Sequence, residues 1–297
     1  MTHKEIIEKF SKLDLSNYPL KEVKKLLRQL GSFGVIITNL HPRKRILRGR
    51  INERSHEFDN VSKLSYKPKE FNTTYMRAST PNETMFYGSI VPEIIGQGEP
   101  TTARITIINE ISEFARDLES IGEQIITFSV WEVQKEIKLL SLLHYKNFER
   151  PTEFSKTLQV EFEKYIKKYP GKKEQTTNIA EFLGEQYAKT VSPEEDFDYL
   201  ISACYSEIAS ELGLDGVLYP SVKLAGEGIN VAIKPKSVSK LKLIHAGECT
   251  LYKNKKQIFV GNDTVAKFNA NGALEYEKAA DDVFVSKEFG RRQVGLA

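Results

Sequence analysis

Apolar residues recur every three or four positions in several parts of the chain and predict helices there. The first 30 residues show this spacing, and Gly31 follows as a C-terminal stop. Residues 151–168 predict a helix with a charged outer face. The clearest pattern predicts a helix over 193–212, which begins with a capping box of Ser192 and Glu195. A further stripe predicts a helix through Ala103, Ile107, Ile111, Phe114 and Leu118.

Short runs of β-branched and aromatic residues predict strands between these helices. The polar stretch 52–84, with its two prolines, predicts mostly loop, and Glu99–Thr101 predicts a helix start. Strands from both halves of the chain indicate an α+β protein. The expected strands cover 33–38, 46–50, 85–89, 125–133, 216–219, 229–234, 250–252, 257–260 and 265–268.

Composition excludes several classes of protein. The 297 residues carry 43 Lys and Arg against 40 Asp and Glu, a net charge of +3, which is too even to indicate a nucleic-acid-binding surface. The lysine-rich stretch 164–173 is short and predicts a solvated face. No apolar run approaches the roughly 20 residues of a membrane span, and the N-terminus lacks a signal core. The two cysteines and five histidines show no zinc spacing, so we expect a reduced cytoplasmic protein without a metal.

Five residues stand in an order that suits chemistry on a nucleotide: Arg48, Arg77, Tyr87, Glu110 and Ser221. An arginine can hold phosphate oxygens bidentately, and a tyrosine face can stack on a cationic heterocycle. A carboxylate can bond ribose hydroxyls and stabilise an oxocarbenium-like centre, while a serine can orient an amide or a phosphate. Together these groups predict cleavage of a ribosyl–base bond.

The segments "YMRASTPNETMFYGS" and "DGVLYPSV…GINVAIKP" resemble the RES domain, a family named for its Arg, Glu and Ser. The resemblance runs over about 46–235, and the late segment is its most specific part. It implies a fold similar to ADP-ribosyltransferases, in which a split β core flanked by helices cradles NAD. It also implies a toxin that consumes NAD as a substrate and pairs with a helix-turn-helix antitoxin. On this reading, a helical N-terminal extension (1–32) precedes the catalytic domain (33–240), and a β-rich tail (241–297) packs on that domain.

The resemblance also implies a role for each residue in the NAD site. Arg48 and Arg77 would lie near the diphosphate, and Tyr87 would pack against nicotinamide. Either Tyr75 or Tyr219 would form a second wall.

The catalytic carboxylate is less narrowly defined. Glu110 would bond the nicotinamide ribose and stabilise positive charge as the glycosidic bond lengthens, and Ser221 would fix the carboxamide, ribose or phosphate. Tyr87 and Glu110 are further apart than in compact family members, so Glu93 and Glu99 remain rivals. We favour Glu110 because the predicted helix would hold it rigidly.

The sequence leaves the reaction and the partners open. Water, phosphate or a protein side chain could accept the ADP-ribose, so a glycohydrolase or phosphorylase stands beside a mono-ADP-ribosyltransferase. A non-catalytic partner-binding module is the alternative of another class. A homo-oligomer is also open, and the sequence indicates neither a membrane nor a direct nucleic-acid partner.

Overall fold

Helices and strands alternate through both halves of the chain, which confirms the mixed α+β class. The computed structural model describes residues 1–92, 103–142, 149 and 151–279. The chain divides into two units, and each unit combines three separate stretches of chain. The first unit consists of Met1–Leu40, Lys67–Tyr87 and Glu136–Ser239, and the second of His41–Tyr66, Gly88–Lys135 and Lys240–Ala297.

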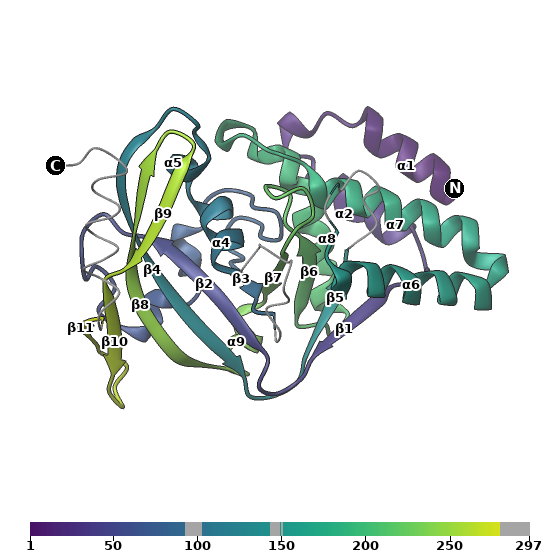
Figure 1. Ribbon diagram of the computed structural model, residues 1–297. Helices are drawn as coiled ribbons and strands as arrows, with labels where there is room; N and C mark the ends of the chain where they lie inside the picture. The colour runs from purple at the N-terminus through teal and green to yellow at the C-terminus, as the bar shows by residue number, and fades with distance from the viewer. Residues whose placement is uncertain (93–102, 143–148, 150, 280–297) are drawn as a thin grey trace. The chain divides into compact units, whose positions relative to one another are not determined.

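The first unit is a mixed sheet with helices gathered beside it (Figure 1). Its strand β5 pairs antiparallel with β1 and parallel with β6, and β6 pairs antiparallel with β7. The strands are β1 (Ile36–Leu40), β5 (Ile137–Ser141), β6 (Gly216–Pro220) and β7 (Ile229–Ile233). The helices are α1 (His3–Lys12), α2 (Leu20–Gln29), α6 (Glu153–Lys168), α7 (Lys173–Ala188), α8 (Leu200–Glu211) and α9 (Pro235–Val238). Short 3₁₀ turns are η1 (Leu15–Asn17), η2 (Lys69–Phe71), η3 (Pro170–Lys172) and η4 (Pro193–Tyr199).

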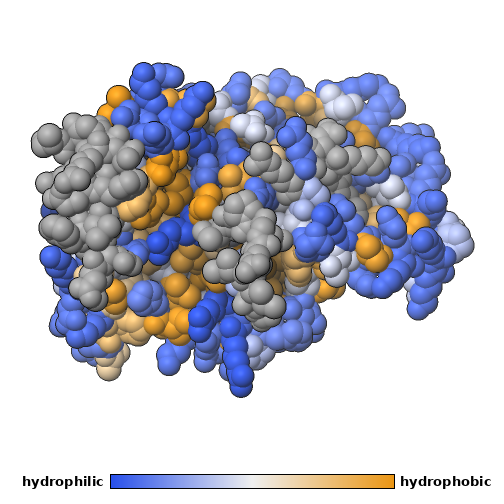
Figure 2. All heavy atoms as spheres, in the orientation of Figure 1, coloured by the Kyte–Doolittle hydropathy of each residue, from blue (hydrophilic) through white to orange (hydrophobic). Residues whose placement is uncertain are grey.

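One apolar core joins the helices of this unit to its strands. The N-terminal helices contribute Ile6 and Leu26 to the same cluster as Ile179 of α7 and Val217 of β6. Apolar side chains drive this packing because their burial removes roughly 25 cal/mol of unfavourable hydration per Å². The surface of the helical side of this unit is mostly hydrophilic (Figure 2), and α6 has the charged outer face that was predicted for residues 151–168, although Phe154 and Val160 are also exposed on it.

The second unit is an antiparallel sheet built on two long strands, β4 (Ile121–Val133) and β8 (Leu241–Asn254). These two pair along their length, with one irregularity at Val130/Trp131. The other strands are β2 (Arg45–Ile51), β3 (Phe86–Ile90, its first two residues in the first unit), β9 (Gln257–Asn262), β10 (Thr264–Phe268) and β11 (Leu274–Lys278). The short helices are α3 (Val61–Leu64), α4 (Ala103–Ile111) and α5 (Glu113–Arg116).

Helix α4 packs closely on β2 at Gly49. An added Cβ at Gly49 would lie 2.4 Å from Cγ2 of Ile107, so the strand and the helix approach as only glycine allows. Leu47, Ile107 and Phe128 belong to the apolar cluster under this helix. Because side chains alternate along a strand, Leu47 and Gly49 mark the face of β2 that α4 covers.

Most of the expected strands are confirmed, with shifted ends. The strand expected at 33–38 begins only at Ile36. Before it, Gly34 lies against the ring of Tyr165 of α6, where a Cβ would be 2.0 Å from Cε1. The strands expected at 46–50, 125–133 and 216–219 are present as β2, β4 and β6. The helix start expected at Glu99–Thr101 lies outside the described residues.

Two helix predictions are wrong in part. The helix expected over 103–118 is divided in two, because α4 ends at Ile111. Ser112 then caps α5: its hydroxyl accepts a hydrogen bond from the Ala115 N–H at 2.9 Å. Leu118, the last residue of the predicted stripe, is exposed. The span 193–212 is η4 followed by α8.

The capping box expected at the start of η4 is absent. The Ser192 hydroxyl donates to the Glu195 carboxylate at 3.0 Å, and Glu195 has non-helical dihedral angles. The Asp196 carboxylate instead accepts the Tyr75 N–H at 2.7 Å, a tertiary contact that the local pattern could not reveal. The division of the chain into 1–32, 33–240 and 241–297 stays a prediction. Among the helices that the structure describes, none is long and apolar enough to cross a membrane.

Candidate functional site

The guanidinium group of Arg77 is the centre of a polar and aromatic cluster in the first unit. Its Nη1 donates to the carbonyl of Tyr187, and its Nη2 donates to the carbonyl of Lys189 at 3.0 Å. These carbonyls lie at the C-terminal end of α7, where a cation meets the negative end of the helix dipole. The guanidinium carbon lies 5.1 Å from the ring centre of Tyr199 and 5.7 Å from that of Tyr219. Arg77 is therefore a buried, fixed positive charge.

Tyr87 is anchored by the turn that carries Arg77. Its hydroxyl shares a hydrogen bond with Ser79 Oγ at 2.7 Å and accepts the Ala78 N–H at 3.2 Å. Met76 and Ser79 close this turn through paired backbone hydrogen bonds of 2.8 and 3.1 Å. Burial raises the pKa of Tyr87 to about 12, so the phenol is neutral at physiological pH.

A second buried tyrosine, Tyr187, links this cluster to α8. Its hydroxyl donates to the carbonyl of Ser202 at 2.8 Å and also contacts Ser206 Oγ. Its ring centre is 5.8 Å from that of Tyr219. Burial raises the pKa of Tyr187 as well. Sequence patterns did not indicate this residue, because a lone tyrosine within a helix carries no distinguishing signal.

The segment around Ser221 forms the end of β6 and a closed loop. Tyr219 is buried in β6, opposite Asn230 of β7. Ser221 is fully buried; its N–H donates to the Gly228 carbonyl at 3.0 Å, and its own carbonyl accepts the Gly226 N–H at 2.8 Å. Tyr75, by contrast, stacks on Tyr18, with ring centres 5.6 Å apart.

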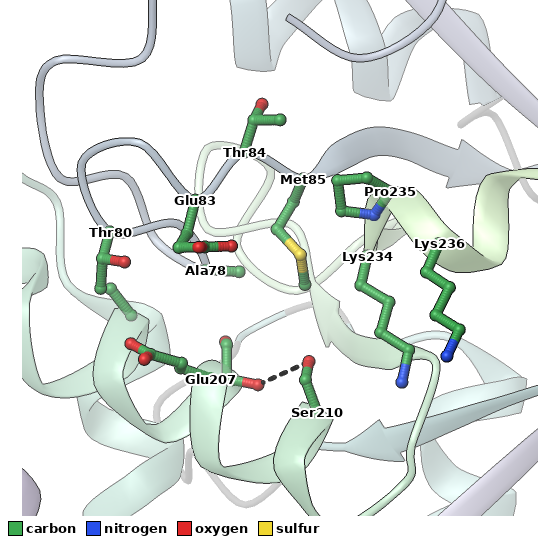
Figure 3. A pocket seen from close by; sticks show the side chains of 12 residues that line it. Ala78, Thr80, Glu83, Thr84, Met85, Glu207, Ser210, Lys234, Pro235 and Lys236 are labelled. Carbon is green, nitrogen blue, oxygen red and sulfur yellow. Dashed lines mark hydrogen bonds between the residues drawn. The ribbon is translucent and has the colours of Figure 1, made fainter. Parts of the chain in front are cut away.

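A cavity of about 310 Å³ lies beside the turn that carries Arg77. Figure 3 shows Glu83 and Glu207 on one side of it and Lys234 and Lys236 on the other, with Met85 between. Ala78 and Ser206, which bond to the hydroxyls of Tyr87 and Tyr187, also line it. Three distant stretches of sequence thus form one cavity: residues 78–85, helix α8 and residues 234–236.

Two of the charged side chains at this cavity already bond to other parts of the protein. Lys234 Nζ donates to the Leu214 carbonyl at 2.6 Å. Glu207 forms an ion pair with Lys24 at 2.7 Å through Oε1, while its buried Oε2 makes no hydrogen bond within the described residues. A donor group on a ligand could therefore satisfy Oε2.

Arg48 and Glu110 belong to the second unit. Arg48 lies on β2 between Leu47 and Gly49, so its side chain starts from the face opposite α4, and its carbonyl accepts a hydrogen bond from Ser129 Oγ at 3.4 Å. Glu110 is half-buried near the end of α4, where Arg116 Nη1 donates to the carbonyl of Asn109 at 2.5 Å. Within this unit, the two residues therefore start from opposite sides of β2.

The structure brings Arg77, Tyr87 and Tyr219 into one cluster, with Ser221 two positions further along the chain. The rival carboxylates Glu93 and Glu99 lie outside the described residues. Among those residues, no group of three or more His, Cys, Asp or Glu side chains is placed to hold a metal ion. No model of a known protein family matches this chain, and no curated protein matches it. The resemblance to RES domains therefore rests on the residues of the chain itself.

Proposed function

We propose that this protein cleaves the nicotinamide–ribose bond of NAD and that its fold is of the ADP-ribosyltransferase-like RES type. One observation carries the proposal: the two segments that resemble the family meet in the first unit. Tyr219 of the late segment stands against the guanidinium of Arg77, and the early segment also supplies Tyr87 to the same cluster.

The electrostatics of the cluster fit a nicotinamide nucleotide. A neutral phenol such as Tyr87 offers a flat surface for a cationic ring. The fixed positive charge of Arg77 favours a diphosphate nearby without reorganisation of the site. Because Arg77 already donates to two carbonyls, we propose that it acts on the diphosphate mainly through its charge.

The proposed reaction balances without any further reagent. The bond from the ribose carbon to the nicotinamide nitrogen breaks, and its electron pair leaves with neutral nicotinamide. A water oxygen bonds to that carbon and loses a proton, which gives ADP-ribose. We assign Glu110 to stabilise the oxocarbenium-like centre and Ser221 to orient the substrate. Phosphate in place of water gives the 1-phosphate of ADP-ribose.

Nicotinamide release from NAD by the purified protein tests the proposal. Removal of the charge in Glu110→Gln should slow release by at least about 100-fold, because charge stabilisation is a large part of such catalysis. Glu113→Gln is the matched control, since Glu113 is exposed on α5. Glu99→Gln tests the rival carboxylate. If the wild type releases no nicotinamide, with or without phosphate, the proposal is wrong.

The fate of the ADP-ribose separates the alternatives. Labelled NAD that yields free ADP-ribose supports hydrolysis, and label on a protein band supports the transferase. A helix-turn-helix antitoxin remains the proposed partner. Growth inhibition that persists in a catalytically inactive Glu110→Gln protein would favour the partner-binding module instead.

A further inference from the structure

A second cavity, of about 460 Å³, lies within the second unit. Its floor is one face of the β4–β8 ladder, where Glu248 pairs with Thr127 and Thr250 pairs with Ile125. Its wall is formed by β10 and β11, which pair along their length. The volume is within the range of roughly 300–1,000 Å³ that small-molecule sites occupy.

The loop after β2 returns to β11 and borders the cavity through Ser55 and His56. Asn60 forms a bridge with Ala273, the Leu274 N–H donates to the Asp59 carbonyl at 2.7 Å, and the Val61 N–H donates to the Gly272 carbonyl at 2.8 Å. These backbone bonds hold the loop in place, so the cavity is preformed.

Glu248 is a buried carboxylate that borders this cavity, with 2% of its surface exposed. Its Oε1 accepts Asn52 Nδ2 at 3.0 Å and the His56 N–H at 2.6 Å. Its Oε2 lies 3.5 Å from Nε2 of His56. Burial raises the pKa of Glu248. A cation placed beside a buried carboxylate stabilises its charged form, because burial has removed that charge from water.

The other charged groups that line the cavity favour a cation. Glu123 and Asp263 add two carboxylates, against Lys278 and His56. Thr250 Oγ1 donates to Asp263, and the Asp263 N–H donates to the Glu248 carbonyl at 2.9 Å, which ties the two acidic residues together.

A flat aromatic pair completes the site. The rings of His56 and Tyr276 are parallel to within 2°, with centres 4.8 Å apart. The Tyr276 hydroxyl donates to the Phe58 carbonyl at 2.6 Å, and the His56 N–H donates to Glu248 Oε1, so hydrogen bonds hold the tyrosine side chain and the backbone of His56 in place. One buried carboxylate beside a flat aromatic surface, with two further carboxylates on the same cavity, suits a planar cation that forms several hydrogen bonds, which is the chemistry of a guanidinium group.

We propose that this cavity binds a guanidinium group, carried by a free arginine-like compound or by an arginine side chain of a peptide. The site is separate from the proposed NAD site, because its lining shares no residue with the Arg77 cluster or with Arg48 and Glu110.

Calorimetric titration of the full-length protein tests this proposal with L-arginine and with N-acetyl-L-arginine methylamide. Binding of free arginine identifies a small-molecule ligand, and binding of the capped form alone identifies a peptide side chain. The corresponding citrulline compounds have nearly the same shape without the charge, and they should bind at least tenfold more weakly. If neither arginine compound binds, or if citrulline binds equally well, the proposal is overturned.

Variants then locate the site. Glu248→Gln should weaken arginine binding at least tenfold while nicotinamide release continues, and Glu275→Gln, an exposed neighbour on β11, should leave binding unchanged. His56→Ala removes half of the aromatic pair from an exposed position, so it tests the site even if Glu248→Gln misfolds. Undiminished binding by a folded Glu248→Gln or by His56→Ala would place the ligand elsewhere.

Discussion

The contact of β2 with α4 yields a prediction about Gly49. In Gly49→Ala the new Cβ would lie 2.4 Å from Ile107 Cγ2 and 3.1 Å from Ile111 Cδ1, and the first distance is too short for any carbon pair. Ile107 is β-branched and has one strongly preferred rotamer in a helix, so it cannot rotate away. Overpacking of this kind costs about 1–3 kcal/mol. Replacing glycine by alanine offsets up to about 1 kcal/mol of this cost, because it lowers the conformational entropy of the unfolded chain. Because a 2.4 Å contact is severe, we expect a cost in the upper half of the overpacking range and therefore a net loss of about 1–2 kcal/mol.

Urea unfolding of matched variants measures this loss. Gly171→Ala is the control, because a Cβ at Gly171 meets no atom within 4 Å, and its stability should change by a few tenths of a kcal/mol at most. Ile107→Leu removes the Cγ2 methyl that clashes. The pair Gly49→Ala and Ile107→Leu should therefore be more stable together than the sum of the single changes predicts.

Helix α4 also carries Glu110, so a shift of the helix should lower the rate of nicotinamide release per folded molecule. Two results would refute the reasoning about packing. One is a Gly49→Ala protein as stable as the wild type. The other is additive effects of Gly49→Ala and Ile107→Leu, which would mean that the two side chains do not meet.

Three further predictions follow from buried groups. Tyr187→Phe should lower the free energy of unfolding in urea by about 1–3 kcal/mol, because it leaves buried partners without a hydrogen bond. Tyr205→Phe should lower it less, because the Tyr205 hydroxyl bonds to no other described residue. Burial raises the pKa of Cys204 to about 12 and that of Cys249 to about 11, so neither thiol should react with a disulfide reagent at pH 8 until the protein unfolds. The pKa of Glu248 is raised in the folded protein, so this residue stabilises the fold at low pH, and that stabilisation is lost as the pH rises through the folded pKa. The Glu248→Gln protein does not titrate at this position. Its Tm should therefore exceed that of the wild type at pH 7–8, and the difference should shrink towards pH 4.

Local patterns predicted the elements that have one apolar face and missed those whose buried face is partly polar. Helix α7 was not expected, because Thr176, Gly184 and Gln186 lie among its buried residues and interrupt the apolar stripe. Strand β5 is only five residues long and follows β4 after a short break, so its apolar run gave no separate signal. The irregular start before α8 depends on the contact of Asp196 with Tyr75, which are distant in sequence.

The candidate site shows a similar division between what a sequence pattern can and cannot predict. The resemblance selected Arg77 and Tyr87 and offered Tyr219 as an alternative to Tyr75, and Arg77, Tyr87 and Tyr219 lie together in the fold. Their surroundings depend on tertiary packing: Tyr187 and Tyr199 complete the cluster from outside the two segments that carry the resemblance. A pattern therefore predicted side chains that lie close together but not the carbonyls and rings that hold them.

The carbonyls that hold Arg77 bear on how its role can be tested. Since the guanidinium binds the end of α7, Arg77→Ala would remove both a stabilising contact and a charge, and a loss of activity would not distinguish them. Arg77→Lys keeps the charge but loses the paired donors. If charge near the diphosphate is what matters, the lysine protein should be less stable yet keep much of its nicotinamide release per folded molecule. If the donors themselves position Tyr219 and Tyr199, activity and stability should fall together.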